Sequence, residues 1–72
     1  MTLKDIPPGK RCTAVKISAA PALKRKLLSM GIVPGTKILV KKSAPFGGPV
    51  QIYLRGYDLI LRRAEAGAVT VN

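Results

Sequence analysis

The stretch Leu27-Leu28-Ser29-Met30-Gly31-Ile32-Val33-Pro34-Gly35-Thr36 predicts how the rest of the chain is arranged. It reads as the last turn of a helix, a fixed corner and the first residue of a strand. Upstream, Pro21 suits the first position of a helix, where a missing N–H costs little. An apolar face then runs from Leu23 through Leu27 to Met30 at the spacing of helical turns. The pattern predicts one short helix that ends at this corner.

Glycine and proline set the geometry of the corner. Gly31 stands where a helix takes a left-handed C-terminal cap, and Ile32 can then fold back onto the last turn. Pro34 cannot easily continue a helix, and Pro34-Gly35 suits a type II turn. We therefore expect the chain to leave the helix in one defined direction.

Apolar and polar residues alternate in five short runs that Gly and Pro separate. In the first run we expect Val15 and Ile17 to face the core. We expect a tight turn at Gly56-Tyr57 and one helical turn closed by Gly67. Five short strands at this spacing predict a small closed barrel, because closure removes exposed strand edges. The runs span residues 11–17, 36–42, 50–55, 58–62 and 68–71.

The length of the chain allows one domain, so we expect residues 1–72 to form a single unit. Its apolar content of 47% is enough for a compact core and argues against disorder. The predicted fold class is mainly β, with one short helix that plugs one end of a five-stranded barrel.

The charge is strongly one-sided. Thirteen Lys and Arg residues oppose three Asp and Glu residues, which gives a net charge of +10. Such a surface favours an acidic partner: nucleic acid, an anionic membrane face or an acidic protein surface. A solvated surface with no specific partner is equally compatible with the charge alone.

The inventory of reactive side chains is too small for an enzyme or a metal site. The chain has no histidine, one cysteine (Cys12) and three acids, Asp5, Asp58 and Glu65, that stand far apart in the sequence. A Ser-His or Cys-His pair is therefore excluded, and iron or zinc lacks a ligand set within one chain. No Gly-Lys-Ser/Thr motif of a phosphate loop occurs. We expect no catalytic residue, no cofactor and no metal, with a site shared between chains left open.

The sequence contains no recognisable targeting or membrane-spanning segment. A lone cysteine suits a reducing cytoplasm. We find no signal peptide at the N-terminus and no run of about 20 apolar residues that could span a membrane. The expected location is the cytoplasm. Whether the protein also associates with the anionic inner face of the membrane is left open.

Two binding modes fit the remaining features. A single-stranded nucleic acid could use outward-facing Tyr53 beside Arg55, since basic grooves with aromatic residues stack bases. A protein could use Phe46, held on a stiff Pro-rich loop, as an apolar anchor with charged residues around it. Phe46 could instead fold back and close the barrel.

Taken together in their order and spacing, these residues resemble the ferrous iron transport protein A (FeoA) family over essentially the whole chain. The segments that carry the resemblance are Leu27 to Gly35, Ala44-Pro45, Gly48-Pro49-Val50, Gly56, Leu59-Ile60-Leu61-Arg62 and Glu65-Ala66.

The resemblance implies an SH3-like barrel and an accessory role in bacterial ferrous iron uptake. It implies that the chain binds the cytoplasmic G-protein domain of the membrane iron(II) transporter and modulates its activity. The alternative is a small basic barrel that binds RNA or single-stranded DNA; this reading has fewer features in its favour. Self-association is left open. For the adaptor, the expected contact residues are Lys24, Arg25, Met30, Ile32, Pro45, Phe46, Gly47, Gly48 and Pro49.

Overall fold

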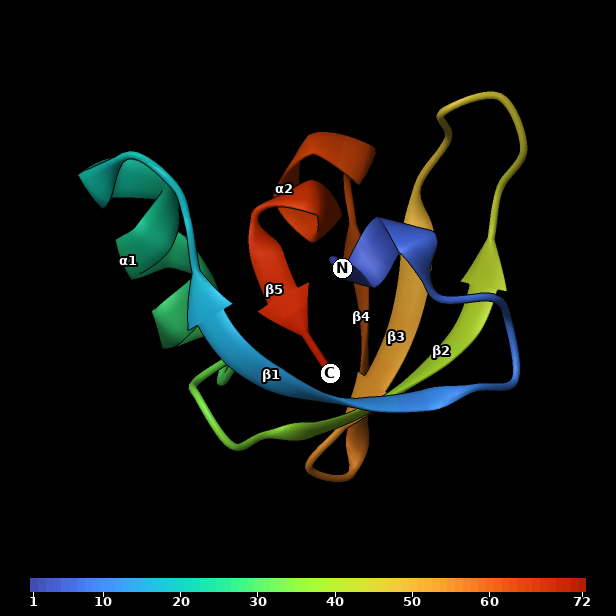
Figure 1. The fold of residues 1–72 in the computed structure, drawn as a ribbon, viewed down its shortest axis with the longest axis horizontal. Helices are drawn as coiled ribbons and strands as arrows, with labels where there is room; N and C mark the ends of the chain where they lie inside the picture. Colours follow the sequence, from blue (N-terminus) through green and yellow to red (C-terminus); the bar gives the residue numbers. More distant parts are fainter.

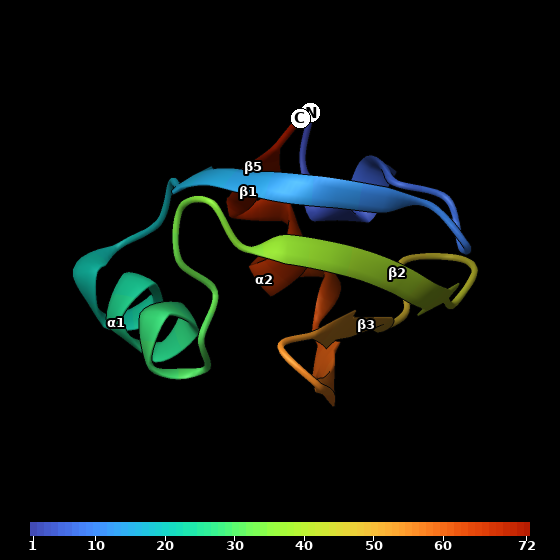
Figure 2. The same ribbon diagram turned by 90° about the horizontal axis from the view of Figure 1, so that it is seen from below.

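A computed structural model describes all residues, 1–72. Five antiparallel strands form one curled sheet in the order β4-β3-β2-β1-β5 (Figure 1). Helix α1 lies at one end of the sheet, beyond β1 and β2 (Figure 2). The elements in chain order are η1 (Leu3–Asp5), β1 (Arg11–Ile17), α1 (Pro21–Ser29), β2 (Lys37–Ser43), β3 (Val50–Leu54), β4 (Tyr57–Leu61), α2 (Arg63–Gly67) and β5 (Val69–Val71).

The corner after α1, residues 30–36, has the predicted geometry. Gly31 has φ +90°, and its N–H donates to the Leu28 carbonyl at 3.0 Å. The N–H of Ile32 donates to the Leu27 carbonyl at 3.1 Å, which completes a Schellman cap. Gly35 has φ +91°, and a hydrogen bond of 3.0 Å closes the turn from Val33 to Thr36, as a type II turn requires.

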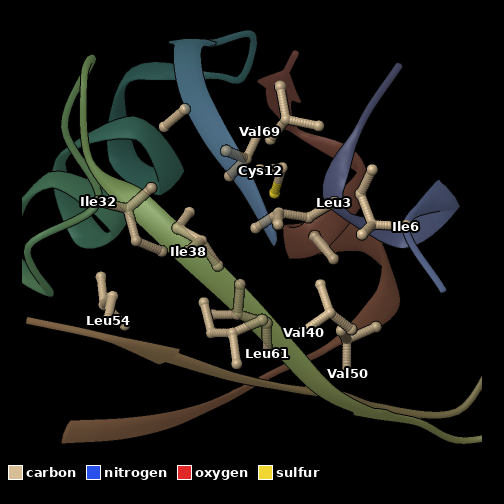
Figure 3. Packing of buried hydrophobic residues seen from close by; sticks show 14 of the residues in the cluster. Leu3, Ile6, Cys12, Ile32, Ile38, Val40, Val50, Leu54, Leu61 and Val69 are labelled. Carbon is tan, nitrogen blue, oxygen red and sulfur yellow. The ribbon is translucent and has the colours of Figure 1, made fainter. Parts of the chain in front are cut away.

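The core lies inside the curled sheet and has the predicted faces in β2 to β5. Ile38 and Val40 are buried in β2, and alternate residues of β3 are buried as well. Figure 3 shows these side chains packed with residues from η1 and the corner. Leu27 of α1 is fully buried, with Leu23 and Met30 half-buried beside it. The apolar face of the helix therefore covers one end of the core.

The prediction for β1 is wrong in part. Cys12 and Ala14 face the core, whereas Val15 is exposed. The pairing with β5 shifts between Ala14 and Lys16, which is a β-bulge. Because a bulge inserts one extra residue, the face that points inward changes there. Ile17, after the bulge, packs against the core as expected.

The turn between β3 and β4 also differs from the prediction by one residue. Leu54 pairs with Tyr57, so Arg55 and Gly56 form the two-residue loop. Both have positive φ, 49° at Arg55 and 90° at Gly56. This is the backbone of a type I′ turn, whose twist matches that of the flanking strands.

The barrel is not closed by hydrogen bonds. β4 and β5 are the two edges of the sheet and do not pair with each other. Instead α2 connects them and contacts both, together with η1. The helical turn that was expected before Gly67 is therefore helix α2, and this helix covers the open side of the sheet.

Candidate partner-binding surfaces

The first group of predicted contact residues lies on α1. Lys24 and Arg25 are exposed. Lys26 on the same helix is engaged: its Nζ lies 2.7 Å from the Glu65 carboxylate. Glu65 also accepts the N–H of Arg62 at 2.9 Å, where α2 begins. The hydrogen bond from Lys26 is the largest of the effects that lower the pKa of the Glu65 carboxyl, followed by that from Arg62. Lys26 therefore fastens α1 to α2.

Two predicted contact residues lie in the corner, and one of them is too deeply buried to contact a partner. Met30 is half-buried, and its carbonyl accepts a hydrogen bond from the Tyr57 hydroxyl. Ile32 has no exposed surface at all. It is the residue that the Schellman cap folds back into the core, so its side chain cannot touch a partner in this conformation.

The second group forms the loop of residues 44–49, which connects β2 to β3. Phe46 stands at its tip and is fully exposed, so it does not fold back onto the sheet. Phe46 has φ 58° and Gly47 has φ 79°, and the Gly48 N–H donates to the Pro45 carbonyl at 3.3 Å. Positive φ at both central residues defines another type I′ turn. A bulky side chain seldom adopts this backbone, so surrounding contacts must hold it.

Arg63 supplies those contacts. From the start of α2 its guanidinium donates to the carbonyls of Gly48 at 3.1 Å and Ala44 at 2.8 Å. It also donates to the Ser43 hydroxyl at 3.1 Å. A guanidinium offers several donors in one plane, which suits two loop carbonyls and the hydroxyl of Ser43 at the end of β2. The sequence analysis missed Arg63, since nothing in the sequence distinguishes it from the other arginines.

The structure does not bring the two groups together. In both views α1 lies at one end of the molecule and the 44–49 loop at the other (Figures 1 and 2). They are therefore two separate surfaces.

A groove of about 440 Å³ lies on the sheet, apart from the 44–49 loop. Tyr53 and Arg55, the residues singled out for nucleic-acid binding, both line it. Arg11 and Lys37 line it too, and their role was not expected from the sequence. The nearby Lys41 Nζ lies 5.6 Å from the centre of the Tyr53 ring and 3.2 Å from the Asp58 carboxylate.

The chemistry of the remaining side chains is limited. No three His, Cys, Asp or Glu side chains come together as a metal site would need. Cys12 is buried in the core, and burial raises the pKa of its thiol. Asp5 accepts the backbone N–H of Thr2 at 2.9 Å, and this bond is the main cause that lowers its carboxyl pKa. Neither α1 nor α2 has the length and apolar character needed to cross a bilayer.

A family model of the FeoA domain matches residues 1–72. The chain belongs to the FeoA family. This is a family of accessory proteins of ferrous iron transport. A curated relative is the Fe(2+) transport protein A/Fe(2+) transporter FeoB fusion protein of Porphyromonas gingivalis (strain ATCC BAA-308 / W83). It is 30% identical over 72 residues, and the chain spans 8% of its length.

Solved FeoA structures share the fold. The FeoA protein from Chlorobium tepidum is 36% identical, with a TM-score of 0.89 over 100% of this chain and 69% of that one. FeoA from Stenotrophomonas maltophilia, solved with zinc, is 26% identical, with a TM-score of 0.87 over 100% of this chain and 89% of that one. The latter is described as a prokaryotic SH3 domain protein. The predicted SH3-like barrel is thus confirmed.

Proposed function

We propose that this chain is an adaptor that docks on the cytoplasmic G-protein domain of the membrane iron(II) transporter and modulates its activity. The observation that carries the proposal is the relative from Porphyromonas gingivalis, in which a matching domain and the transporter FeoB are one protein. Fusion keeps two partners at a high effective concentration, which is useful when they act together. Where the two are not fused, the domain must bind the transporter through a surface of its own.

The 44–49 loop is the docking element that the geometry supports best. Arg63 holds it in one shape, so little conformational entropy is lost when a partner binds. Phe46 at its tip presents a whole aromatic ring to solvent. Buried aromatic anchors dominate the binding energy of many interfaces. Pro45 begins the turn and Pro49 follows it. Gly47 has open space where a Cβ would stand and allows a partner to approach the backbone, whereas Gly48 lies against Ala44.

Lys24 and Arg25 on α1 form a second, electrostatic contact in the proposal. Both are exposed, and neither side chain makes a hydrogen bond or ion pair within the chain. The net charge of +10 also attracts the protein to an anionic membrane surface, by about 1 kcal/mol for each Lys or Arg near it. The proposed location is therefore the cytoplasm, at the inner face of the membrane. Flotation with anionic vesicles at low salt checks this part, and a chain that stays off the vesicles contradicts it.

Docking is tested by adding the isolated G-protein domain of the same organism's transporter to the ¹⁵N-labelled chain. We expect the amide signals of the 44–49 loop to move. Phe46→Ala should weaken binding by about tenfold or more, because an anchor side chain is lost. Val15→Ala is the matched control, since Val15 is also an exposed apolar residue but lies outside the proposed surfaces. If no signal moves at near-millimolar partner, the proposal is wrong.

Modulation is tested by iron(II) uptake in cells that lack this chain. Wild type and Val15→Ala should restore uptake, whereas Phe46→Ala should not. Reversing the charge of Lys24 and Arg25 tests the α1 surface in the same assay, and full rescue by that variant clears α1 of any role. The competing hypothesis, nucleic-acid binding, depends on the groove lined by Tyr53 and Arg55. The experiment on that groove below tests it.

A further inference from the structure

The groove is built from residues 11–13 of β1, residues 37–39 of β2, the last two residues of β3 and Arg55, which follows β3. Cys12 and Ile38 are buried and pair across β1 and β2, and Leu54 of β3 is buried as well. Their backbones form the floor. The residues that flank these three buried residues have outward-facing side chains, which form the walls. The lining residues are Arg11, Cys12, Thr13, Lys37, Ile38, Leu39, Tyr53, Leu54, Arg55 and Asn72.

The strand register places the wall residues in two rows. One row is Arg11, Leu39 and Tyr53, which are partners across β1, β2 and β3. Thr13 and Lys37 are partners in the other row, on the side where Arg55 follows β3. Residues two apart in a strand lie about 7 Å apart, and three strands span about 10 Å. The groove thus has the width of one extended chain and the length of about three of its residues.

No acidic side chain opposes the positive charge of the groove. Arg11, Lys37 and Arg55 line it, and no acidic residue does. None of the three makes a side-chain hydrogen bond or an ion pair within the chain. An arginine can bind a carboxylate through two parallel hydrogen bonds, so two free arginines on opposite walls suit an acidic chain that lies between them.

The acidic side chains of residues 1–72 do not supply that segment. All three of its acidic side chains are engaged: Asp5 with Thr2, Asp58 with Lys41, and Glu65 with Lys26. A second copy would bring the same engaged carboxylates and a net charge of +10. Another molecule with spare negative charge therefore suits the groove better than these carboxylates or a second copy do.

We propose that the groove binds an extended acidic segment of a partner protein. Carboxylates of the segment lie against Arg11 and Arg55, and Lys37 neutralises charge between them. An apolar side chain of the segment packs on Leu39 and Tyr53. The groove lies apart from the 44–49 loop, so a partner that already holds Phe46 meets a second site on the same domain. The inference rests on the groove alone and does not require the partner to be the iron transporter.

A nucleic acid fits the same groove less well. Single strands bind through several aromatic side chains on which successive bases stack. Here Tyr53 is the one aromatic residue in the lining, and Lys41 already lies over its ring. Cations and apolar residues in one groove suit a peptide that carries both acidic and apolar side chains.

The test is a titration of the ¹⁵N-labelled chain with a capped heptapeptide in which glutamate alternates with threonine and one central leucine. The amide signals of Cys12, Ile38 and Leu54 should move. The double variant Arg11→Gln/Arg55→Gln should weaken binding by about tenfold or more, as expected for the loss of charge-assisted hydrogen bonds. Lys16→Gln/Lys42→Gln removes the same charge from exposed positions outside the groove and should weaken binding by at most about twofold, since screening limits distant charges.

Three outcomes would each overturn this inference. Equal weakening by the two double variants would mean that net charge, not the groove, attracts the peptide. Equal binding of the same peptide with glutamine in place of glutamate would remove the role of the carboxylates. Tighter binding of an oligothymidine, with shifts at the same amides, would make the occupant a nucleic acid. Failure of the transporter domain to bind, alongside binding of the acidic peptide, contradicts the proposed function and leaves this inference standing.

Discussion

At the scale of single residues, Gly31 shows how closely the corner is constrained. Its φ of +90° already favours glycine. A Cβ at this position would also lie 2.6 Å from the Tyr57 hydroxyl, which is bonded to the Met30 carbonyl. Gly35 has nearly the same φ, +91°, but open space around it. The two glycines therefore separate backbone strain from crowding.

Gly31→Ala should lower the free energy of unfolding by more than Gly35→Ala does. Both changes place alanine at positive φ, which costs about 1–2 kcal/mol. Only Gly31→Ala also displaces the Tyr57 hydroxyl, and the lost hydrogen bond adds about 1 kcal/mol. Urea unfolding of the two variants measures the difference. Adding Tyr57→Phe to each should remove most of the excess, and equal losses for the two alanine variants would refute this account.

At the scale of elements, β2 to β5 follow their sequence pattern and β1 does not. Alternation in residues 50–54 predicts the buried face of β3 because β3 pairs with β4 without a shift and the irregularity in its pairing with β2 lies on the β2 side, between Val40 and Lys42. In β1 the bulge is set by the pairing with β5, about 55 residues further along the chain. The residues near Val15 carry no glycine or proline that would signal it. Alternation alone therefore put Val15 on the wrong face.

The 44–49 loop is an element whose shape depends on one side chain from elsewhere. Arg63→Ala should lower the free energy of unfolding by about 1–2 kcal/mol, since the change removes a part-buried charged donor from two loop carbonyls and the Ser43 hydroxyl. Amide exchange at Ala44 and Gly48 should speed up, because their hydrogen bonds are those of the loop itself. Urea unfolding and hydrogen exchange measure both effects. Arg62→Ala is the matched control, since that side chain is exposed; an equal effect there would contradict the role of Arg63.

At the scale of the whole molecule, three long-range contacts join parts that the sequence pattern cannot connect. They are Tyr57 with Met30, Lys26 with Glu65, and Arg63 with the 44–49 loop. Local periodicity predicted the helix, the corner and the core faces, because these depend on near neighbours. The partners of a long polar side chain depend on the final packing. For the same reason the sequence pointed to Tyr53 and Arg55 but not to Arg11 and Lys37, which β1 and β2 bring to the same groove.

The contact between Lys26 and Glu65 joins α1 to α2 and makes stability depend on pH. The pKa of Glu65 is lower in the folded state than its ordinary value, with the Lys26 hydrogen bond as the main cause. Its contribution is therefore present above the ordinary carboxyl pKa and is lost as the pH falls through the folded-state pKa. At neutral pH, Glu65→Gln should lower the free energy of unfolding by about 1–2 kcal/mol. The loss is no larger because Lys26 is largely exposed, so water replaces part of the hydrogen bond.

As the pH falls, the stabilities of wild type and Glu65→Gln should converge, since the wild-type carboxyl is then neutral too. Asp58→Asn is the control, because it breaks a surface pair and should change stability little at any pH. Urea unfolding across the acidic range measures all three proteins, and a constant gap between wild type and Glu65→Gln would show that packing, not charge, makes this contact stabilising.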